Sequence, residues 1–429
     1  MSDVFFVRTE MLQQQAPPST SVGIVGWMRE NLFSGWLNSI LTVVSALFIF
    51  FVAGGFLSWA VSPTWGATSL TECREILAGH EGACWGVIRD RWVQLLFGFY
   101  PSELYWRPIL TFVLLAVALA PVLFAEKVPA KLVYFTAAFP FLMPWLLWGG
   151  SIWGPLAAAA GFVIGYFVYG AVVKAAGSLA GLIVGVAAAL IWWLFLAPVV
   201  VDLLSGTVSI GLEAVESRKF GGMMLSITIG IVAIACSLPI GIVLALGRQS
   251  DLMILKSLCV GFIEFIRGVP LITLLFVAST LLNIFMPPGT NFDIIMRVII
   301  MATLFASAYM AEVIRGGLAA LPKGQYEGAD SLGLNYWQAQ RLIIMPQALK
   351  ISIPGIVSTF IGLFKDTTLV SVIGLLDPLG LSNAIRADTD WNGVVWELYG
   401  FIALLFFIFC FSMSRYSMYL ERKLRTDHQ

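Results

Sequence analysis

The sequence predicts an all-α, polytopic membrane protein with about ten transmembrane helices. Apolar residues make up 59% of the chain and charged residues 12%, against about 45–50% and about 25% in soluble globular domains. Apolar runs of about 18–25 residues recur along the chain, each long enough to cross a hydrocarbon core of about 30 Å as a helix. The 25 basic and 25 acidic residues cancel, which argues against nucleic-acid binding.

The expected spans follow from these apolar runs. They are 36–61, 108–125, 131–149, 152–173, 178–201, 221–247, 269–286, 298–315, 352–376 and 398–418. The first run is longer than a signal-peptide core, so we expect an uncleaved span. The stretch 254–286 would reach about 50 Å as one helix and is too long for a single crossing. We expect a break at Gly268, Val269 and Pro270, because proline favours the first helical turn. Residues 254–267 then form a short amphipathic helix at the cytoplasmic interface.

The basic residues predict the orientation, because cytoplasmic loops are enriched in Lys and Arg. With an even number of spans both termini lie on one side of the membrane. Placing them in the cytoplasm puts fifteen Lys and Arg inside and eight outside, with Arg267 and Lys365 unassigned in or near spans. We therefore expect a multi-pass protein with a cytoplasmic N-terminal segment, 1–35, and a cytoplasmic tail, 421–429.

The chain divides near residue 215 in its sequence character. Residues 36–215 form an accessory membrane region of about five spans with a large external loop, 62–107. Residues 216–420 hold five further spans, a polar insert at 319–350 and the polar groups that suggest a mechanism. No internal repeat is evident, which weakens a secondary-carrier architecture built on inverted repeats.

Cysteines and small residues in the accessory region suggest structure rather than chemistry. Cys73 and Cys84 share the external loop and could form a disulfide in an oxidising compartment, or remain two thiols. The fifth expected span repeats small residues every four positions, a pattern that lets a neighbouring helix approach closely. They are Gly177, Gly181, Gly185 and Ala189.

The polar insert carries the most informative motif of the chain, YEGADSLGLNYWQAQRLIIMPQAL, from Tyr326 to Leu349. A polar, helix-competent segment of this kind does not belong in a bilayer. Its spacing resembles the cytoplasmic coupling signature of ABC importer membrane subunits: E-A-A, three residues, G, nine residues, I, one residue, L-P. Two positions depart from it, Gly328 for the second residue and Met345 for Leu. The positions of the coupling signature that we expect to contact an ATPase subunit are Glu327, Gly328, Ala329, Gly333, Ile343 and Pro346.

The C-terminal half, about 210 residues, resembles the permease subunits of the polar amino-acid importer family. The matching segments are GGMMLSITIGIVAIACSLPIGIVLALGR, FIEFIRGVPLI, FASAYMAEVIRGGLAALPKGQYEGADSLG, FKDTTLVSVIG and RYSMYLERKL. Extra N-terminal spans ahead of the five-helix type I core resemble, in particular, the M-type subunit of the bacterial general L-amino-acid transporter. The resemblance implies an inner-membrane permease that moves L-amino acids inward, a homologous permease partner, two ABC ATPase subunits and a periplasmic amino-acid-binding protein.

The coupling motif has a local physical rationale. Glu327 to Ser331 can form a short helix, and Gly333 permits a sharp turn with positive φ. Asn335 can cap a second helix that ends before Pro346. Such an elbow can present a knob to a cleft on a soluble partner, although an ordinary amphipathic hairpin would share these features.

Two further sets of polar residues suggest a pathway or gate. Glu264 and Arg267 are three residues apart and can pair on one helix face; the alternative is an interfacial pair that anchors a span. Lys365, Asp366, Thr367 and Thr368 lie within an apolar run, where ionised groups usually face a cavity or a partner. Lys365 could attract an amino-acid carboxylate and Asp366 its ammonium, or the two could form a structural ion pair.

The sequence also limits the function classes. No G-x-x-x-x-G-K-[ST] motif occurs, so we expect ATP hydrolysis on a separate subunit and no catalytic residues here. We expect no cofactor, and no metal site, because the two histidines, His80 and His428, are far apart. An ion-coupled secondary carrier and a non-transporting membrane scaffold remain alternatives, and neither requires the coupling motif.

Overall fold

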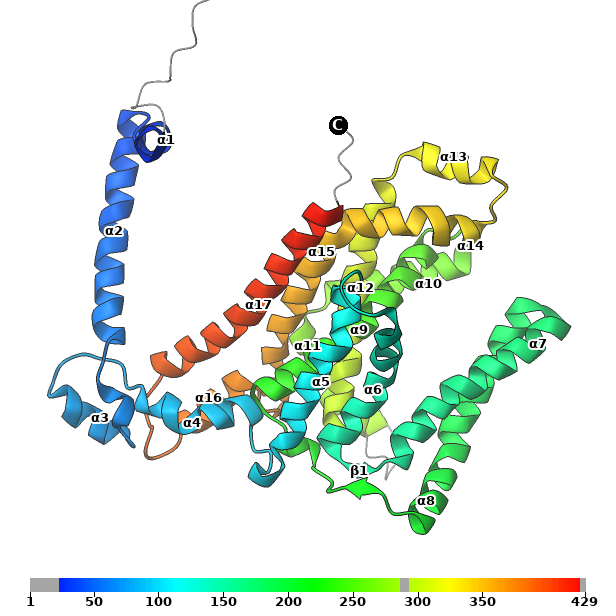
Figure 1. Cartoon of the computed structure of the whole chain (residues 1–429), viewed down its shortest axis with the longest axis horizontal. Helices are drawn as coiled ribbons and strands as arrows, with labels where there is room; N and C mark the ends of the chain where they lie inside the picture. The colour runs from blue at the N-terminus through cyan, green and yellow to red at the C-terminus, as the bar shows by residue number, and fades with distance from the viewer. Residues whose placement is uncertain (1–22, 286–292, 425–429) are drawn as a thin grey trace, which may run out of the picture. The chain divides into compact units, whose positions relative to one another are not determined.

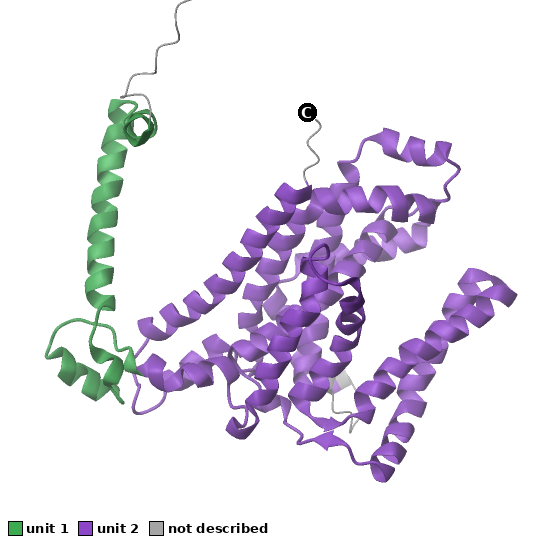
Figure 2. Ribbon diagram, viewed as in Figure 1, with its two compact units in different colours: residues 1–86 green, residues 87–429 purple. Residues whose placement is uncertain are grey.

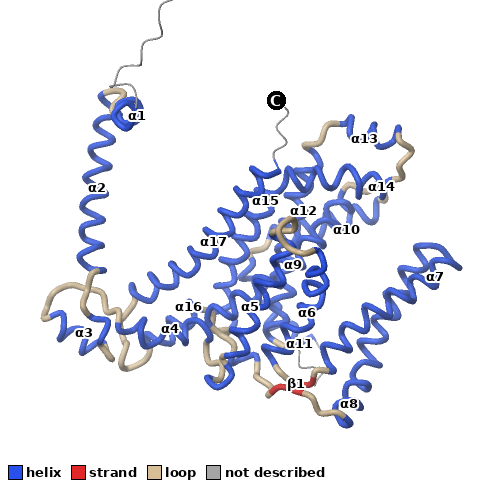
Figure 3. Tube along the Cα trace, viewed as in Figure 1, coloured by secondary structure: helices blue, strands red, loops and turns tan. Residues whose placement is uncertain are grey.

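The computed structural model describes residues 23–285 and 293–424, and these form an all-α chain with two very short strands (Figure 3). Eight described helices are long and apolar enough to cross a membrane, and a bent pair makes nine. One of the eight, Trp153–Thr207, has 55 residues, about 80 Å of helix. Its backbone leaves the helical conformation at Gly177 (φ 85°, ψ 171°), and the two arms supply two crossings. With the two arms counted separately and the bent pair as one span, the described residues hold ten candidate spans, in agreement with the about ten expected.

Residues 1–86 form one compact unit and residues 87–429 the other (Figure 2). The helices of the first are α1 (Gly23–Asn31), α2 (Trp36–Ala60) and α3 (Leu70–Leu77). None of the residues of α2 is buried. Beyond α2, the Thr64 hydroxyl donates to the Ala83 carbonyl at 2.5 Å and accepts from the Trp85 amide at 3.0 Å. A disulfide joins Cys73 to Cys84, with the Cα atoms 5.8 Å apart.

The second unit begins with helices that the sequence assigned to the external loop and the accessory spans. They are α4 (Gly86–Phe97), α5 (Trp106–Leu123), α6 (Val133–Trp148), α7 (Trp153–Ile191) and α8 (Ala197–Thr207). The strands β1 (Gly150–Ser151) and β2 (Gly211–Leu212) pair antiparallel and close the α7–α8 segment at its base. The expected loop 62–107 is therefore partly helical, since it includes α3 and α4.

Arg107, at the start of α5, is fully buried, although the sequence placed it in the external loop. Its guanidinium donates to the carbonyl oxygens of Leu146 at 2.6 Å, Glu213 at 2.7 Å and Leu147 at 3.4 Å. The first and third of these carbonyls lie in the last turn of α6, where helical carbonyls lack intrahelical partners. Arg107 thus joins α5, the end of α6 and the chain that leads to the next helix.

Small residues serve two purposes in α7. A Cβ on Gly185 would meet the carbonyl oxygen of Gly165 at 2.9 Å, so Gly181, Gly185 and Ala189 let the two arms pack closely, as their spacing predicts. Gly177 belongs to the same repeat but is the turn itself, with positive φ and open space around it. Its expected packing role is wrong, because it marks the point where the helix reverses (Figure 1).

The remaining helices form the central bundle of Figure 1 and the segment with α13 and α14 that projects from it. They are α9 (Gly222–Arg248), α10 (Met253–Gly268), α11 (Leu271–Phe285), α12 (Ile294–Ala319), α13 (Lys323–Ser331), α14 (Tyr336–Ala339), α15 (Met345–Asp366), α16 (Pro378–Arg386) and α17 (Trp396–Leu424). The chain bends by 100° between α10 and α11, which confirms the break expected at Gly268 to Pro270. Residues 1–22, 286–292 and 425–429, which include the ends of both expected cytoplasmic segments, lie outside the described residues.

The bundle core lies between α9, α12 and α15. Leu225 and Ile229 of α9 pack with Ile295 and Val298 of α12 and with Leu363 of α15. Toward the other end of the bundle a second apolar cluster joins α9, α10, α12 and α15. Burial of these apolar faces between helices fixes the ends of α12 and α15, and the polar insert connects those ends.

Asp377 directly precedes α16 as its N-cap residue and is completely buried. Its carboxylate accepts the amide N–H groups of Leu379 at 3.1 Å and Gly380 at 3.0 Å, which satisfies the first turn of the helix. Burial raises the pKa of Asp377 to about 6, against the lowering effect of these hydrogen bonds.

Candidate functional site

The polar insert folds into an elbow that projects from the ends of α12 and α15 (Figure 1). Its first arm is α13, which begins directly after Pro322. Proline lacks the N–H that a helix interior requires, so Pro322 separates α13 from the preceding helix, α12. Glu327 and Gly328 are exposed, whereas Ala329 is 1% exposed. The helix therefore turns its small residue toward the protein and its acidic residue toward solvent.

The turn after α13 follows the sequence prediction closely. Gly333 has φ 68°, a conformation that side chains with a Cβ adopt only at a cost. Nothing lies within 4 Å of a Cβ placed there, so the backbone conformation, not crowding, requires glycine. Asn335 then caps α14, because its side chain accepts the amide of Gln338 at 2.9 Å and the Gln338 side chain accepts the amide of Asn335 at 3.0 Å.

The second arm differs from the prediction, since it does not end before Pro346. A π-helical turn, Gln340–Ile344, joins α14 directly to α15, and Pro346 lies in the first turn of α15. The wider turn displaces the regular hydrogen-bond ladder, and the missing N–H of a proline costs little in a first helical turn. Ile343 is partly buried and Pro346 is exposed on this continuous helix.

The elbow is joined to the bundle by both polar and apolar contacts. The Gln347 amide of α15 donates to the Gln325 side chain of α13 at 2.9 Å. Tyr326 and Ile343 pack against the apolar cluster that contains Ile344 and Ala348. Movement of α13 would therefore be transmitted to α15 through these contacts.

The elbow also exposes large apolar side chains that the motif does not specify. Leu332 is 74% exposed, Trp337 70% and Leu342 64%. Exposed apolar side chains next to polar residues commonly mark a protein interaction site. Sequence reasoning missed these residues. Leu332 beside Gly333 and Trp337 close to Asn335 are large apolar residues in an otherwise polar insert, and this contrast could have indicated an interaction surface.

Glu264 and Arg267 belong to a cluster of charges at the ends of α9, α10 and α12. Glu312 of α12 lies 2.5 Å from Arg315, 3.2 Å from Arg248 and 3.8 Å from Arg267. Arg248 also contacts Glu264 at 2.9 Å. The expected Glu264–Arg267 pair is replaced by contacts to neighbouring helices, because the side chains of α10 meet better-placed partners on α9 and α12.

Arg267 makes a second contact, since its guanidinium lies 5.6 Å from the centre of the Tyr309 ring. A cation near an aromatic face is attracted by the ring quadrupole. Glu312 and Arg248 were not singled out from the sequence, because their partners are distant along the chain. The cluster holds α10 against the ends of α9 and α12.

Lys365, Asp366, Thr367 and Thr368 lie where α15 gives way to a 3₁₀ segment, Thr367–Ile373. Lys365 is exposed and Asp366 is half-buried, and within 23–285 and 293–424 neither side chain has an ion-pair partner within 4.0 Å. The pathway role and the structural-pair alternative for Lys365 and Asp366 both stay predictions.

The two threonine hydroxyls are already satisfied locally. Thr367 donates to the Phe364 carbonyl at 2.7 Å and Thr368 donates to the Lys365 carbonyl at 2.9 Å. Thr367 lies next to Gly230 in the first half of α9, whereas the Glu312 cluster lies near the end of α9. The structure thus does not bring the two sets of expected pathway residues together.

Comparisons with known proteins agree with this architecture. Residues 237–426 match the family described as "Binding-protein-dependent transport system inner membrane component". The chain is 58% identical to "Glutamate/glutamine/aspartate/asparagine transport system permease protein BztC" of Rhodobacter capsulatus, with 100% of both chains covered. It is 40% identical to "Inner membrane amino-acid ABC transporter permease protein YhdY" of Escherichia coli, over 93% of each chain.

Among solved structures, "an amino acid ABC transporter with histidines" is similar, with 31% identity, 47% of this chain and 91% of that chain covered, and a TM-score of 0.42. BztC and YhdY, in contrast, match along both halves of the chain, including the accessory spans. Their identity and coverage decide the assignment. The chain belongs to the family of permease subunits of amino-acid ABC transporters.

Proposed function

We propose that this permease subunit forms, with a homologous permease, the pathway of an ATP-driven importer of acidic and amide L-amino acids. The relative at 58% identity supports this substrate class, because its name describes a permease protein of a glutamate, glutamine, aspartate and asparagine transport system. Two separate ABC ATPase subunits supply the energy, and a periplasmic binding protein delivers the amino acid.

The projecting elbow carries this proposal. In it, α13 and the Gly333 turn form a knob with an exposed carboxylate, Glu327, and exposed apolar side chains, Leu332 and Trp337. We propose that the knob fits a cleft on an ATPase subunit. Closure of the ATPase pair would then move α13, and the Gln325–Gln347 hydrogen bond and the apolar cluster would pass that movement to α15.

The proposed orientation places both termini in the cytoplasm of a bacterial cell and the protein in the inner membrane. The Cys73–Cys84 disulfide supports it, because disulfides persist in the periplasm and are rare in the cytosol. The segment after α2 is then periplasmic, and α13, separated from it by an odd number of further crossings, is cytoplasmic.

The proposed pathway includes Lys365, Asp366, Thr367 and Thr368 in the outer half of the bundle. The exposed Lys365 ammonium supports this role, because an ionised group in a span is stable only when it faces water or a partner. Glu264 and Arg267 form the proposed gate near the cytoplasmic ends of the helices. Their partner Glu312 is shared with two further arginines, and breaking these contacts would release α10.

A coupling assay tests the proposal. The complete complex, reconstituted in liposomes, is compared with a Glu327→Lys variant and with Glu75→Lys, which reverses an exposed charge on α3. We expect Glu327→Lys to lose ATPase co-purification and substrate-stimulated ATP hydrolysis by about tenfold, because a reversed charge opposes docking. Glu75→Lys should keep both. Normal uptake by Glu327→Lys would refute the docking role, and ion-driven uptake by the purified subunit alone would favour a secondary carrier.

A further inference from the structure

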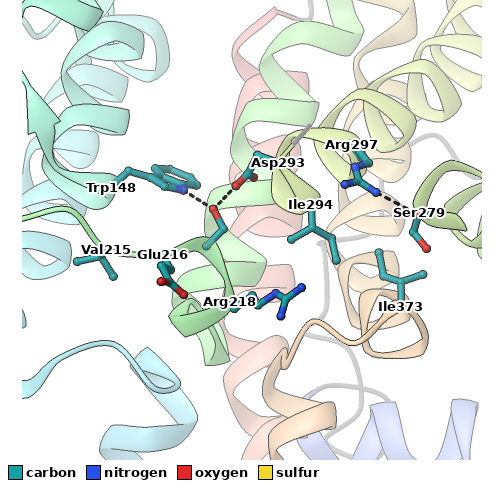
Figure 4. Close-up of a pocket in the computed structure, with 10 residues that line it drawn as sticks. Trp148, Val215, Glu216, Arg218, Ser279, Asp293, Ile294, Arg297 and Ile373 are labelled. Carbon is teal, nitrogen blue, oxygen red and sulfur yellow. Dashed lines mark hydrogen bonds between the residues drawn. The ribbon is translucent and has the colours of Figure 1, made fainter. Parts of the chain in front are cut away.

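An open pocket of about 570 Å³ lies beside the start of α12 (Figure 4). One side is built by the end of α6 and the segment before α9, and the other by α11, α12 and the 3₁₀ segment after α15. Its lining residues include Trp148, Glu216, Ser217, Arg218, Asp293 and Arg297. The accessory region and the five-helix core therefore both contribute to it. A volume of this size suits a small ligand.

Part of the polar lining is engaged in holding the wall together. The Ser217 hydroxyl accepts the indole N–H of Trp148 at 2.7 Å and donates to one oxygen of Asp293. The other Asp293 oxygen accepts the amides of Ile295 and Met296 at 2.9 and 3.1 Å. The Trp148 ring stacks on Phe220 with the ring centres 4.4 Å apart. These contacts fix the wall but leave Asp293 and Ser217 little capacity for a ligand.

The remaining charges complement a zwitterion. Arg218 and Glu216 are exposed, and neither side chain makes a hydrogen bond or an ion pair to another of the residues that the structure describes. Figure 4 shows Arg218 extending from its segment toward Ile294 and Ile373 across the pocket. The Arg297 guanidinium donates one N–H to the Ser279 carbonyl at 3.0 Å and adds positive charge to the far side. A guanidinium binds a carboxylate with two parallel hydrogen bonds.

We propose that this pocket is an entry subsite for the free α-amino acid, with the carboxylate on Arg218 and the ammonium on Glu216. The inference rests on the proposed function and deepens it, because it places a substrate site in this subunit. The helix α12 spans about 39 Å from Ile294 to Ala319 and leads directly into the elbow. The pocket therefore lies at the end of the bundle away from the elbow, on the face where the binding protein delivers its amino acid.

A thiol-protection experiment tests the subsite directly. Ser279 is replaced by cysteine in a chain whose Cys236, Cys259 and Cys410 are alanine and whose disulfide is kept, and the whole transporter complex is purified without binding protein. The rate of modification by an anionic methanethiosulfonate reagent is measured with and without L-glutamate at about 10 mM. We expect L-glutamate to slow modification several-fold, and glutarate, which lacks the ammonium, to slow it less.

Variants of the wall assign the effect. Arg218→Gln should remove the protection, because one charge-assisted hydrogen bond contributes about ten- to a hundredfold in affinity. Glu216→Gln should reduce the advantage of glutamate over glutarate. Lys219→Gln removes a neighbouring exposed charge that does not line the pocket, and it should keep full protection.

The outcomes separate this inference from the proposed function, because ATP-driven uptake is measured on the same preparation with binding protein added. Uptake without protection, or protection that persists in Arg218→Gln, would overturn the subsite and leave the importer role intact. Failure of the unsubstituted complex to take up any amino acid would overturn the proposed function instead. Protection by L-glutamate that is lost in Arg218→Gln and retained in Lys219→Gln supports the subsite.

Discussion

Neutralising Glu312 should loosen the attachment of α10 to the bundle. In Glu312→Gln the side chain keeps its size but loses the charge that faces Arg248, Arg267 and Arg315. Arg248 keeps Glu264 as a partner at 2.9 Å, and Arg267 keeps the Tyr309 ring. The Arg315 guanidinium, which contacts the carboxylate through two nitrogens, loses most.

The expected cost follows from the exposure of the partners. The Glu312 side chain is 24% exposed, and Arg248, Arg267 and Arg315 are 24%, 32% and 39% exposed, so water screens these contacts in part. Exposed ion pairs contribute about 0.2–1 kcal/mol each, and three contacts give about 1–3 kcal/mol. A change of 1 kcal/mol shifts Tm by about 2–4 °C in domains of 150–250 residues. For this longer chain we expect a fall of about 2–6 °C.

The Tm of the detergent-purified protein measures the effect; it is obtained by heating samples to a series of temperatures and measuring by size-exclusion chromatography how much folded protein remains. Glu327→Gln is the matched control, because Glu327 is an exposed carboxylate with no ion-pair partner within 4.0 Å among the described residues. Its Tm should not move. The gap between Glu312→Gln and the unsubstituted protein should also narrow at 1 M salt, where the Debye length falls to about 3 Å. Equal Tm values for the two variants would refute the argument.

Three further predictions concern other parts of the chain. Gly333→Val should cut stimulated ATPase activity about tenfold without loss of membrane insertion, because a β-branched residue disfavours φ 68°; Gly328→Ala, where a Cβ meets open space, should keep the activity, and equal losses would contradict the turn argument. Lys365→Met should change thermal stability by less than about 1 kcal/mol, as expected for an exposed side chain, while lowering uptake; a large loss of stability would indicate a structural role instead. Asp377→Asn should unfold at higher temperature than the unsubstituted protein at pH 7.5 but not at pH 4.5. A folded-state pKa of about 6, above about 3.9 unfolded, means that the folded protein gains stability as pH falls through 6, and the asparagine removes this gain; parallel pH profiles of the two proteins would contradict it.

The features predicted correctly are those that depend on short stretches of sequence. Apolar run lengths defined the spans, and Gly268 and Pro270 marked the bend between α10 and α11. Gly333 and Asn335 specified a turn and a cap whose hydrogen bonds close within four residues. The elbow was therefore predictable before its surroundings were known. The boundary near residue 215, which was drawn from sequence character, stays a prediction. The two compact units divide elsewhere, after residue 86.

The features that were missed depend on contacts distant along the chain. Arg248 and Glu312 are 64 residues apart, so the spacing of Glu264 and Arg267 within one helix suggested the wrong partners. The π-helical turn before Pro346 depends on how α14 and α15 pack against the bundle. The pocket beside α12 joins Trp148 and Ser217, which are 69 residues apart. One sequence without its tertiary contacts holds no signal for such pairings.

The anchoring of the accessory spans has a consequence for how the sequence can drift. The three oxygens that Arg107 contacts belong to the main chain of Leu146, Leu147 and Glu213, and every amino acid supplies a main-chain oxygen. Substitutions at those three positions therefore leave the acceptors in place, whereas lysine at position 107 has a single nitrogen and cannot reach three carbonyls in the same planar arrangement. Mutational tolerance across this contact is one-sided: in a saturation scan, position 107 should accept arginine alone while its three acceptor positions accept many residues.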